Sequence, residues 1–555
     1  MGIQSVATVA AGLFSSLGYR VRVLNDFESR IVGGYTFTQM LVSTGQALCV
    51  PSLPDLVFCI APSVLPTDLA SLPAETLVFT DTAKLGAVPA NVVPFPASTL
   101  LPPGQRRAEN MLYLGAMAGI LRIAVDALAP FIASRFARKG DAVVQANLAA
   151  CRAGHAHAAS LAGDDLALAQ ASLPPGRALS GNEALTLGAV AAGVGLYAGY
   201  PMSPATSIME GLARLSAQRG IFVEQAEDEI AAANIALGAA YAGVRAMTAT
   251  SGGGLSLMTE TVSMAAIAEL PVVFVNVQRP GPATGLATRT AQGDLSMVLS
   301  MGHGEFSRAV LTPGTPERAF VAAQKAFYLA EKYQVPVFLL SDQHLADSLV
   351  TCTGLEVVPR FQERFLKTTS DLEEPSQVRR YLDTPAGVPP RPVPGLTNDL
   401  VVADSHVHDE LGHITEDPEV SGRLLARLAG KERRMVADMD LPEVAFDQPA
   451  SPDVLLIGWG STHGALRHAT VRLRESGLSA NHLHFHELHP LDWPRVAEML
   501  RAARTTVCVE NNATGQLARL LRSEICFNPT HTVLRWDGRP FYADRLLDAI
   551  RRLAP

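Results

Sequence analysis

The chain has 555 residues, of which 48% are hydrophobic and 18% are charged, and its formal net charge is −8 at pH 7. A chain of this length exceeds what one hydrophobic core can organise, so several domains are expected. The negative net charge gives no electrostatic basis for binding nucleic acid or an anionic membrane surface.

Hydropathy and cysteine usage exclude further classes of protein. No uninterrupted run of about 18 apolar residues is present, so no membrane span is expected, and the first residues lack the pattern of a signal peptide. The six cysteines are scattered without a CxxC pair. That pattern argues against a disulfide framework, a zinc site or an iron–sulfur cluster held by this chain alone. A soluble, cytoplasmic protein is therefore predicted.

Two α/β blocks make up the first part of the chain. Residues 1–165 alternate short apolar runs with helical segments, in the rhythm of a parallel α/β unit. Residues 175–348 repeat this rhythm, with strand-like runs such as "PVVFVNVQ" separated by helix-length segments. The predicted fold class is therefore α/β with more than one domain.

The composition changes over residues 349–450, where "YLDTPAGVPPRPVPGLTND" predicts an extended, proline-rich connector. Residues 451–555 form a third α/β block. Its histidines His484, His486 and His489 could suggest a metal, but no acid is fixed beside them in the sequence. We interpret them as structural, and no metal site is predicted.

The stretch "QAEDEIAAANIALGAAYAG", residues 225–243, places three acids before a run of small side chains. Acids at the start of a helix are favoured by its unpaired N–H groups and need no further cause. The small residues indicate a helix deep in a packed core, where other backbones come close. A carboxylate buried there requires a partner.

Three glycine-containing segments follow predicted strands. In "TATSGGGLSLMTE" (248–260) the glycines permit close approach of either a flat ligand or another backbone, and the lysine of a phosphate-binding loop is missing. "YAGYPMSPAT" (197–206) reads as a loop. "VNVQRPGPATGLATRTAQGDL" (275–295) carries Arg279 and Arg289 after a buried-type strand, where α/β sheets bind ligands and where arginine suits a carboxylate. A surface ion pair is the alternative for each arginine.

The order of these motifs resembles one family. YP-x-[ST]-P, E-x-E-I-A-A, T-A-T-S-G-G-G-L-S-L-M and V-Q-R-P-G-P-A-T-G look like the α-subunit of 2-oxoacid:ferredoxin oxidoreductases, most closely the 2-oxoglutarate type with a fused γ domain. "HDELGHITED", "HELHPLDWP" and "ENNATGQL" extend the resemblance over nearly the whole chain. It implies a γ-type domain (1–165), a domain that binds the pyrimidine of thiamine diphosphate (175–348) and a transketolase C-terminal-like domain (451–555).

The resemblance assigns a chemical role to one of the three acids. In enzymes that use thiamine diphosphate, a glutamate hydrogen-bonds N1′ of the aminopyrimidine and favours the imino tautomer that deprotonates thiazolium C2. Glu229 matches that glutamate, which leaves Glu227 and Asp228 as acids of the first helical turn. The other cofactor-binding candidates are Tyr200, Pro201, Gly252 and Gly253.

The resemblance also assigns substrate contacts. Arg279 matches the arginine that binds the 2-oxoacid carboxylate, and Ser203 stands where the family usually has a threonine, so the hydroxyl is kept. Both join Glu229 as catalytic candidates. Thr288 matches a threonine of substrate recognition. Arg289 and His303 are candidates for the second carboxylate of 2-oxoglutarate, with a structural loop role as the alternative.

The chain lacks the GDG segment that binds Mg²⁺ and diphosphate, and its cysteines cannot supply an iron–sulfur centre. In the family both belong to a β-subunit. The resemblance therefore implies half an active site, thiamine diphosphate and Mg²⁺ shared with that partner, an (αβ)2 assembly and ferredoxin as electron carrier.

The first block departs from the family pattern, because the sequence begins inside the usual G-x-G-G-Q-G turn. Either the first central strand is missing or the assigned start is late. In the family this domain helps to enclose coenzyme A. The candidates for its phosphates are Arg30, Gly33, Gly34 and the cluster of Arg135, Arg138 and Lys139, and a solvated helix end is the alternative for that cluster.

The predicted function is coenzyme-A-dependent oxidative decarboxylation of a 2-oxoacid, 2-oxoglutarate being favoured, or the reverse carboxylation. Two alternatives stay open at this point. One is the same chemistry on pyruvate, branched-chain or aryl 2-oxoacids, and the other is a non-catalytic scaffold subunit.

Overall fold

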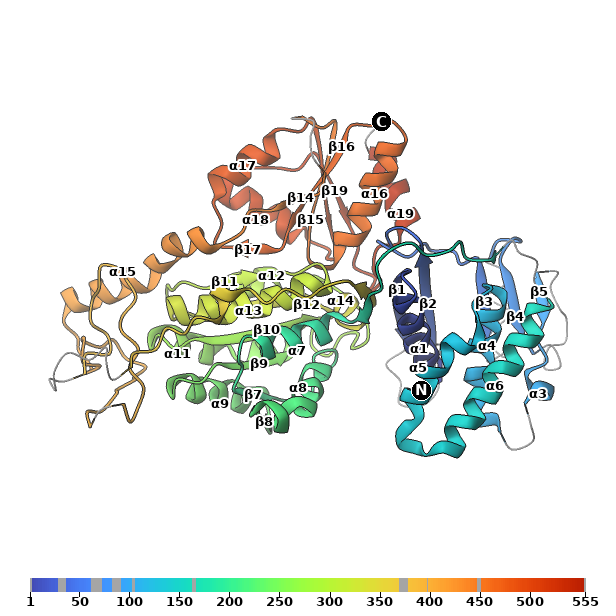
Figure 1. The fold of residues 1–555 in the computed structure, drawn as a ribbon. Coiled ribbons are helices and arrows are strands. Elements are labelled where there is room, and N and C mark those ends of the chain that lie inside the picture. Colours follow the sequence, from blue (N-terminus) through green and yellow to red (C-terminus); the bar gives the residue numbers. More distant parts are fainter. Residues whose placement is uncertain are drawn as a thin grey trace. The chain divides into compact units, whose positions relative to one another are not determined.

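The computed structural model describes residues 2–27, 36–60, 72–81, 91–101, 105–161, 166–368, 378–396, 398–446 and 451–553. These residues divide into two compact units (Figure 1). The first comprises residues 1–179, 348–353 and 542–545, and the second comprises 180–347, 354–541 and 546–555. None of the helices in the described ranges combines the length and the hydropathy that a membrane crossing requires.

The first unit contains two sheets. One is four-stranded, in the order β2-β1-β13-β6, and the other is three-stranded, in the order β3-β4-β5. The strands are β1 (Arg20–Phe27), β2 (Thr36–Ser43), β3 (Leu56–Cys59), β4 (Leu77–Thr80), β5 (Val92–Pro94), β6 (Arg177–Leu179) and β13 (Leu349–Cys352).

The pairing in the first unit corrects the expectation of a parallel sheet. β3, β4 and β5 are parallel, but β1 pairs antiparallel with both β2 and β13, and β13 pairs antiparallel with β6. Residues 349–352, placed by the sequence at the start of the connector, thus form an inner strand of this sheet. By pairing on both sides, β13 satisfies strand edges that would otherwise present unpaired backbone groups.

Helices cover these sheets and enclose an apolar core that includes Phe14, Val21, Phe79 and Leu112. The first of them, α1, begins at Gly2, and β1 is the first strand along the chain. The helical elements are α1 (Gly2–Ser16), α3 (Ala97–Leu100), η3 (Arg106–Ala108), α4 (Glu109–Ile120), η4 (Val125–Leu128), α5 (Ala129–Phe136), η5 (Ala137–Lys139) and α6 (Asp141–Ala159).

The second unit is built on a seven-stranded sheet in the order β17-β11-β12-β10-β9-β7-β8. Its strands are parallel except for β17, which pairs antiparallel with β11. β10 has all seven residues buried, as expected of an inner parallel strand with both faces covered. The strands are β7 (Leu196–Gly199), β8 (Phe222–Gln225), β9 (Ala246–Thr250), β10 (Val272–Gln278), β11 (Ala309–Leu311), β12 (Val337–Asp342) and β17 (Glu487–His489).

Alternate residues of the inner strands point into two different cores. Phe274 of β10 belongs to a core with α9 and α11, whereas Val273 and Val275 belong to a core with α7, α8 and α13. The sheet is therefore the middle layer of an α/β/α arrangement. Its helices are α7 (Gly181–Ala191), α8 (Thr206–Arg219), α9 (Glu229–Tyr241), α10 (Gly252–Leu257), α11 (Thr259–Ile267), α12 (Leu295–Ser300), α13 (Pro316–Tyr333) and α14 (Gln343–Asp347).

A five-stranded sheet, ordered β14-β16-β15-β18-β19, occupies the last part of the second unit. β15, β16, β18 and β19 are parallel, and β14 is an antiparallel edge strand. The elements are β14 (Glu443–Val444), β15 (Val454–Trp459), η10 (Gly460–Thr462), α16 (His463–Glu475), β16 (Ala480–Phe485), α17 (Trp493–Arg501), β18 (Thr505–Glu510), α18 (Gln516–Ile525), β19 (His531–Leu534) and α19 (Ala543–Leu553).

The connector contains η7 (Pro359–Gln362), α15 (Pro418–Met435) and η9 (Val436–Asp438). Two buried carboxylates of the seven-stranded domain hold it. Glu331 contacts Arg364 and Arg391 of the connector together with Arg245. Glu269 contacts Arg427 and Lys431 of α15. Buried ion pairs and buried apolar side chains such as Phe361 and Met435 thus both fix the connector to the domain.

Candidate functional site

The candidate residues follow four adjacent parallel strands, β8, β7, β9 and β10. Tyr200 and Ser203 follow β7, Glu229 follows β8, Gly252 follows β9 and Arg279 follows β10. In the sheet, Gly199 pairs with Gln225, and Thr250 pairs with Asn276. The four strands therefore end within a few residues of one another. The fold thus places these residues at the carboxyl end of one sheet.

This end of the sheet also contains a topological switch point. From β7 the chain moves outward to β8, and it then returns to β9 on the other side of β7. Loops that leave neighbouring strands in opposite directions open a crevice at the carboxyl ends, which is where open α/β sheets bind ligands. The segments after β7 and after β9 border that crevice.

Glu229 is the first residue of α9, and only 4% of it is exposed. Asp228 caps the helix, because its Oδ1 accepts a hydrogen bond from the backbone N–H of Ala231 at 2.7 Å. Asp228 is therefore the cap, and Glu227 precedes the helix instead of lying in its first turn. Asp228, and not Glu229, therefore supplies the side-chain cap of α9.

The Oε1 atom of Glu229 is buried without a hydrogen-bond partner among the described residues. It lies over the glycine turn after β9, where a Cβ on Gly254 would come within 2.6 Å of Oε1. Glycine at 254 therefore allows the carboxylate to lie against the turn. A buried oxygen without a partner carries a desolvation cost that a ligand donor would relieve.

Arg279 approaches the same place from β10. Its Nη1 donates to the backbone carbonyl of Ser203 at 2.8 Å, and its Nε is buried without a partner in the described chain. Burial lowers the pKa of Arg279, and the negative charge of Glu229 opposes that shift. The side chain of Ser203 is exposed. Glu229, Arg279 and Ser203 are thus brought together, with the serine carbonyl as the anchor of the arginine.

The remaining cofactor candidates differ in their surroundings. Tyr200 is 41% exposed and Pro201 is partly exposed. A Cβ on Gly252 would lie 2.5 Å from Oδ2 of Asp294, so the backbone there is closely covered. Gly253 is exposed, and a Cβ added there would lie 3.7 Å from the backbone oxygen of Ala283. The three glycines form the first turn of α10 and do not precede it.

The candidates for a second carboxylate lie farther along the chain. Thr288 and Arg289 are partly buried in the loop after β10, and the backbone N–H of Arg289 donates to Leu286. Arg289 packs against Gly538, because a Cβ added to that glycine would lie 3.0 Å from Cβ of Arg289. His303 follows α12, with an exposed side chain and a backbone N–H that donates to Ser263.

Sequence reasoning missed a buried polar group beneath the site. Nδ2 of Asn276 donates to Oδ2 of Asp294 at 2.9 Å, and the backbone N–H of Asp294 donates to Oε1 of Gln278 at 3.0 Å. Burial raises the pKa of Asp294, and the hydrogen bond from Asn276 opposes that shift. The available signal was two polar residues, at alternate positions, inside the otherwise apolar strand β10.

Comparison with known proteins gives two family-model matches. Residues 187–421 match the model described as pyruvate flavodoxin/ferredoxin oxidoreductase, thiamine diphosphate-binding, and residues 1–157 match pyruvate ferredoxin/flavodoxin oxidoreductase. A relative from Aeropyrum pernix, named 2-oxoacid:ferredoxin oxidoreductase 2, subunit alpha, is 32% identical over 87% of this chain and 76% of its own length. The chain belongs to the 2-oxoacid:ferredoxin oxidoreductase family.

Two further relatives agree with this assignment. The 2-oxoglutarate oxidoreductase subunit KorA of Mycobacterium tuberculosis is 30% identical over 93% of this chain and 84% of its own length. A solved structure of the Magnetococcus marinus 2-oxoglutarate:ferredoxin oxidoreductase, with 2-oxoglutarate, coenzyme A and succinyl-CoA bound, superposes with a TM-score of 0.91. It is 30% identical, and the match covers all of this chain and 97% of that one. The resemblance and the multidomain α/β fold class predicted from the sequence are confirmed.

The candidates for coenzyme A lie in the first unit. Arg30, Gly33 and Gly34 fall outside the described residues. Arg135, Arg138 and Lys139 are exposed at the end of α5 and in η5. Arg135 donates to Oγ of Ser5 at 3.3 Å, and Nζ of Lys139 lies 5.6 Å from the ring centre of Phe136.

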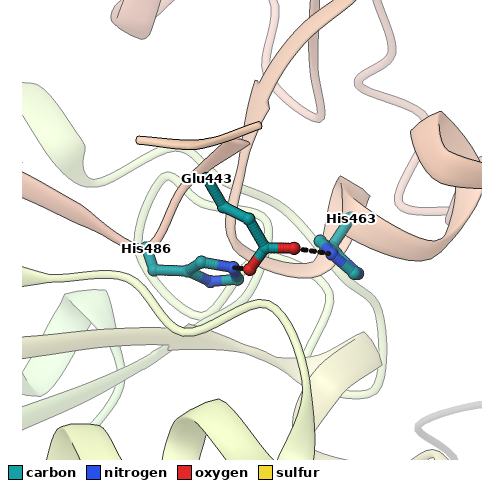
Figure 2. Close-up of side chains that lie close together, drawn as sticks. All are labelled: Glu443, His463 and His486. Carbon is teal, nitrogen blue, oxygen red and sulfur yellow. Dashed lines mark hydrogen bonds and ion pairs between the residues drawn. The ribbon is translucent and has the colours of Figure 1, made fainter. Parts of the chain in front are cut away.

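The histidines of the last block are accompanied by acids, which the sequence did not indicate. Figure 2 shows Glu443 between His463 and His486. Its carboxylate oxygens lie 3.7 Å from Nε2 of His463 and 3.2 Å from Nε2 of His486. His489 contacts Glu432 of α15 at 2.9 Å. The expectation that no acid is fixed beside these histidines was wrong for His486 and His489, because the acids come from β14 and α15, which are distant in sequence. His484 instead contacts His482 and the backbone carbonyl of Gly460.

Hydrogen bonds account for this cluster without an ion. The backbone N–H of Gly314 donates to Nδ1 of His486, so the neutral ring carries its proton on Nε2 and donates it to Glu443. A metal on Nε2 would need the opposite tautomer. Arg318 also donates to Glu443 at 2.6 Å. His463 and His486, with Arg318, hold the pKa of Glu443 well below its usual value.

Proposed function

We propose that this chain is the α-subunit of a coenzyme-A-dependent 2-oxoglutarate:ferredoxin oxidoreductase. Such an enzyme interconverts 2-oxoglutarate and coenzyme A with succinyl-CoA and CO2, while electrons pass to or from ferredoxin. The relatives named for 2-oxoglutarate support the substrate. The observation that carries the proposal is the buried carboxylate of Glu229, with Oε1 unpaired, beside Arg279 at the switch point of the sheet.

The residues at this end of the sheet fit the aminopyrimidine of thiamine diphosphate. Glu229 offers an unpaired acceptor for the N1′ proton, and Gly254 leaves room beside it. Tyr200, Pro201, Gly252 and Gly253 would line the ring. When bound, the cofactor supplies the carbon nucleophile that attacks the keto carbon of the substrate.

Arg279 and Ser203 would hold the carboxylate next to that keto carbon. Arginine suits this role because its planar fork pairs with both carboxylate oxygens, and the Nε of Arg279 has no protein partner in the described residues. The exposed hydroxyl of Ser203 is free to add a further donor. Thr288, Arg289 and His303 are proposed for the distal carboxylate of 2-oxoglutarate.

A β-subunit would complete the site by contributing the diphosphate and Mg²⁺ ligands and an iron–sulfur cluster, in a cytoplasmic (αβ)2 assembly that exchanges electrons with ferredoxin. Exposed apolar side chains near the site support such a partner. Tyr200 and Ile230 adjoin the site residues directly, and Leu257 and Leu286 lie on α10 and on the loop after β10. Exposed apolar residues grouped around a polar site are typical of protein–protein interfaces.

The test is a reduction assay on the co-purified complex with thiamine diphosphate, Mg²⁺, coenzyme A and ferredoxin or a viologen dye. We expect faster reduction with 2-oxoglutarate than with pyruvate at equal concentration. Preference for pyruvate or a branched-chain or aryl 2-oxoacid would keep the chemistry and overturn the distal-carboxylate assignment. No reduction with any 2-oxoacid, from a complex that holds cofactor and cluster, would favour a scaffold subunit.

A further inference from the structure

A basic hollow lies on the connector, between α15 and residues 383–387, away from the carboxyl end of the seven-stranded sheet. Its volume is about 430 Å³, and Arg423, Arg427 and Arg434 line it together with Asp383. Figure 1 shows α15 in the connector. A cavity of this size accommodates a small molecule.

The three arginines share one face of α15. Positions 423, 427, 430 and 434 are separated by four, three and four residues, which places them in one row along a helix. Gly430 takes the third position of this row, and a Cβ added there would meet no atom within 4 Å. The glycine therefore leaves open space between the guanidinium groups.

The hollow has more positive than negative charge. Arg427 is almost fully buried; it donates to Glu269 at 2.8 Å and to Asp383 at 3.0 Å, and its Nε has no partner in the described part of the chain. Arg423 and Arg434 have no carboxylate within 4.0 Å among the described residues. Lys431, behind them, already pairs with Glu269 at 2.6 Å. One carboxylate thus faces three guanidinium groups, in a chain whose net charge is negative.

The wall of the hollow is shaped to hold Arg434. The guanidinium lies directly against Gly387, where an added Cβ would fall 1.7 Å from Nη1, and Nη2 donates to the carbonyl of Pro385 at 3.0 Å. Gly387 has φ of +62°, a conformation that favours glycine. The backbone therefore positions this cation in the wall.

We propose that this hollow binds a small molecule that carries at least two phosphate or carboxylate groups. Guanidinium forks recognise both groups through paired charge-assisted hydrogen bonds. Arg423 and Arg427 are one helical turn apart, and Arg427 and Arg434 are two turns apart, roughly 6 and 11 Å along the axis. Arg423 and Arg434 are thus about 17 Å apart along the axis, so a ligand with two or more anionic groups can contact more of these guanidinium groups than a single anionic group can.

The test is isothermal titration calorimetry of the full-length chain with inorganic pyrophosphate and, separately, with citrate, at constant ionic strength. We expect saturable binding of at least one probe, weakened roughly tenfold or more in the Arg423→Gln/Arg434→Gln variant because two charged hydrogen-bonding groups are lost. Pyrophosphate alone would indicate a phosphate ligand, and citrate alone a polycarboxylate. Arg433→Gln, an exposed arginine of the same helix outside the hollow, is the matched control and should bind as the wild type does.

Gly430 gives a second, independent pair of variants. Gly430→Ala adds a methyl group in open space and should retain binding, whereas Gly430→Glu places a carboxylate among the arginines and should abolish it. Absence of saturable binding to either probe would overturn the proposal. Equal affinity in the wild type and the double arginine variant, or equal weakening by Arg433→Gln, would also overturn it.

Discussion

Two buried glutamates of the same domain differ in what surrounds them. Glu331, near the end of α13, is 2% exposed and contacts three arginines, Arg245, Arg364 and Arg391. Burial alone would raise the pKa of Glu331, but the hydrogen bonds of Arg364 and the charges of all three arginines lower it. Glu229, at the start of α9, is equally buried, yet its Oε1 has no partner in the described residues.

This difference separates a structural carboxylate from a binding one. A buried charge is tolerated when hydrogen bonds and opposite charges compensate its desolvation, and Glu331 has both. Glu229 has the charge of Arg279 nearby, but among the described residues its Oε1 lacks the hydrogen bonds that Glu331 receives. We infer that the compensation is supplied by a ligand, and substitutions at the two positions test this inference.

The largest expected effect is on turnover. Glu229→Gln should reduce 2-oxoacid-dependent dye reduction by roughly 10³-fold or more, because an amide cannot exchange a proton with N1′ as a carboxyl group can. The unfolding midpoint should change little, because Oε1 of Glu229 has no hydrogen bond to lose among the described residues. Steady-state assays and thermal denaturation of the complex measure the two quantities.

Glu227→Gln is the matched control, because it makes the same change at an exposed position two residues away. It should leave both turnover and stability as they are. Normal activity in Glu229→Gln would contradict the binding role of Glu229 and remove its distinction from Glu331. Loss of assembly with the partner subunit together with loss of activity would do the same.

The reverse pattern is expected at Glu331. Glu331→Gln leaves Arg245 and Arg391 buried without a counter-charge, which should destabilise the chain by about 3–5 kcal/mol. Catalysis per folded molecule should be little changed. Denaturant unfolding, with the active fraction determined in parallel, distinguishes the two effects. A stability equal to that of the wild type would show that the arginines find other partners. The ion pairs of Glu331 would then not explain its structural role.

The sequence allowed good prediction of what depends on local pattern. Strands such as β10 and β12 are buried on both faces and therefore appear as continuous apolar runs. The candidates after β7, β8, β9 and β10 could be grouped because the motifs resemble one family and because the carboxyl ends of parallel strands meet. Their individual roles remain predictions.

Contacts between distant residues could not be predicted in this way. β13 pairs with β1 across more than 300 residues, from Val350 to Arg22. The three partners of Glu331 come from positions 245, 364 and 391, and no local pattern relates them. Glu443 reaches His463 and His486 only because β14 joins the edge of the sheet beside β16.

The cluster around Glu443 differs from both Glu331 and Glu229, because two imidazoles, together with Arg318, are the partners of that carboxylate. Burial lowers the pKa of His486 from 6.5 to about 4. The folded ring therefore stays neutral while the unfolded ring gains a proton, and stability is lost as the pH falls from 6.5 to 4. The loss is about 1.4 kcal/mol per pH unit, or roughly 3 kcal/mol in all.

His486→Gln tests this dependence, because glutamine can donate to Glu443 but does not titrate. The difference in unfolding free energy between the wild type and the variant should move by up to about 3 kcal/mol in favour of the variant between pH 6.5 and pH 4. Groups with the opposite trend, such as Glu487, whose pKa burial raises to about 7, cancel in this difference. Parallel stability curves for the two proteins would contradict the neutral assignment of His486.

The smallest expected effect concerns Ser203. A substitution there tests how Arg279, the charged neighbour of Glu229, is held. The arginine is anchored by the carbonyl of Ser203 at 2.8 Å, an interaction that Ser203→Ala preserves. Removal of the hydroxyl should therefore cost one hydrogen bond to the substrate, about 1 kcal/mol, or roughly a fivefold decrease in kcat/KM. Ser203→Thr should restore the wild-type value. A loss as large as that of Glu229→Gln would mean that the hydroxyl acts in the chemical step and not in substrate binding alone.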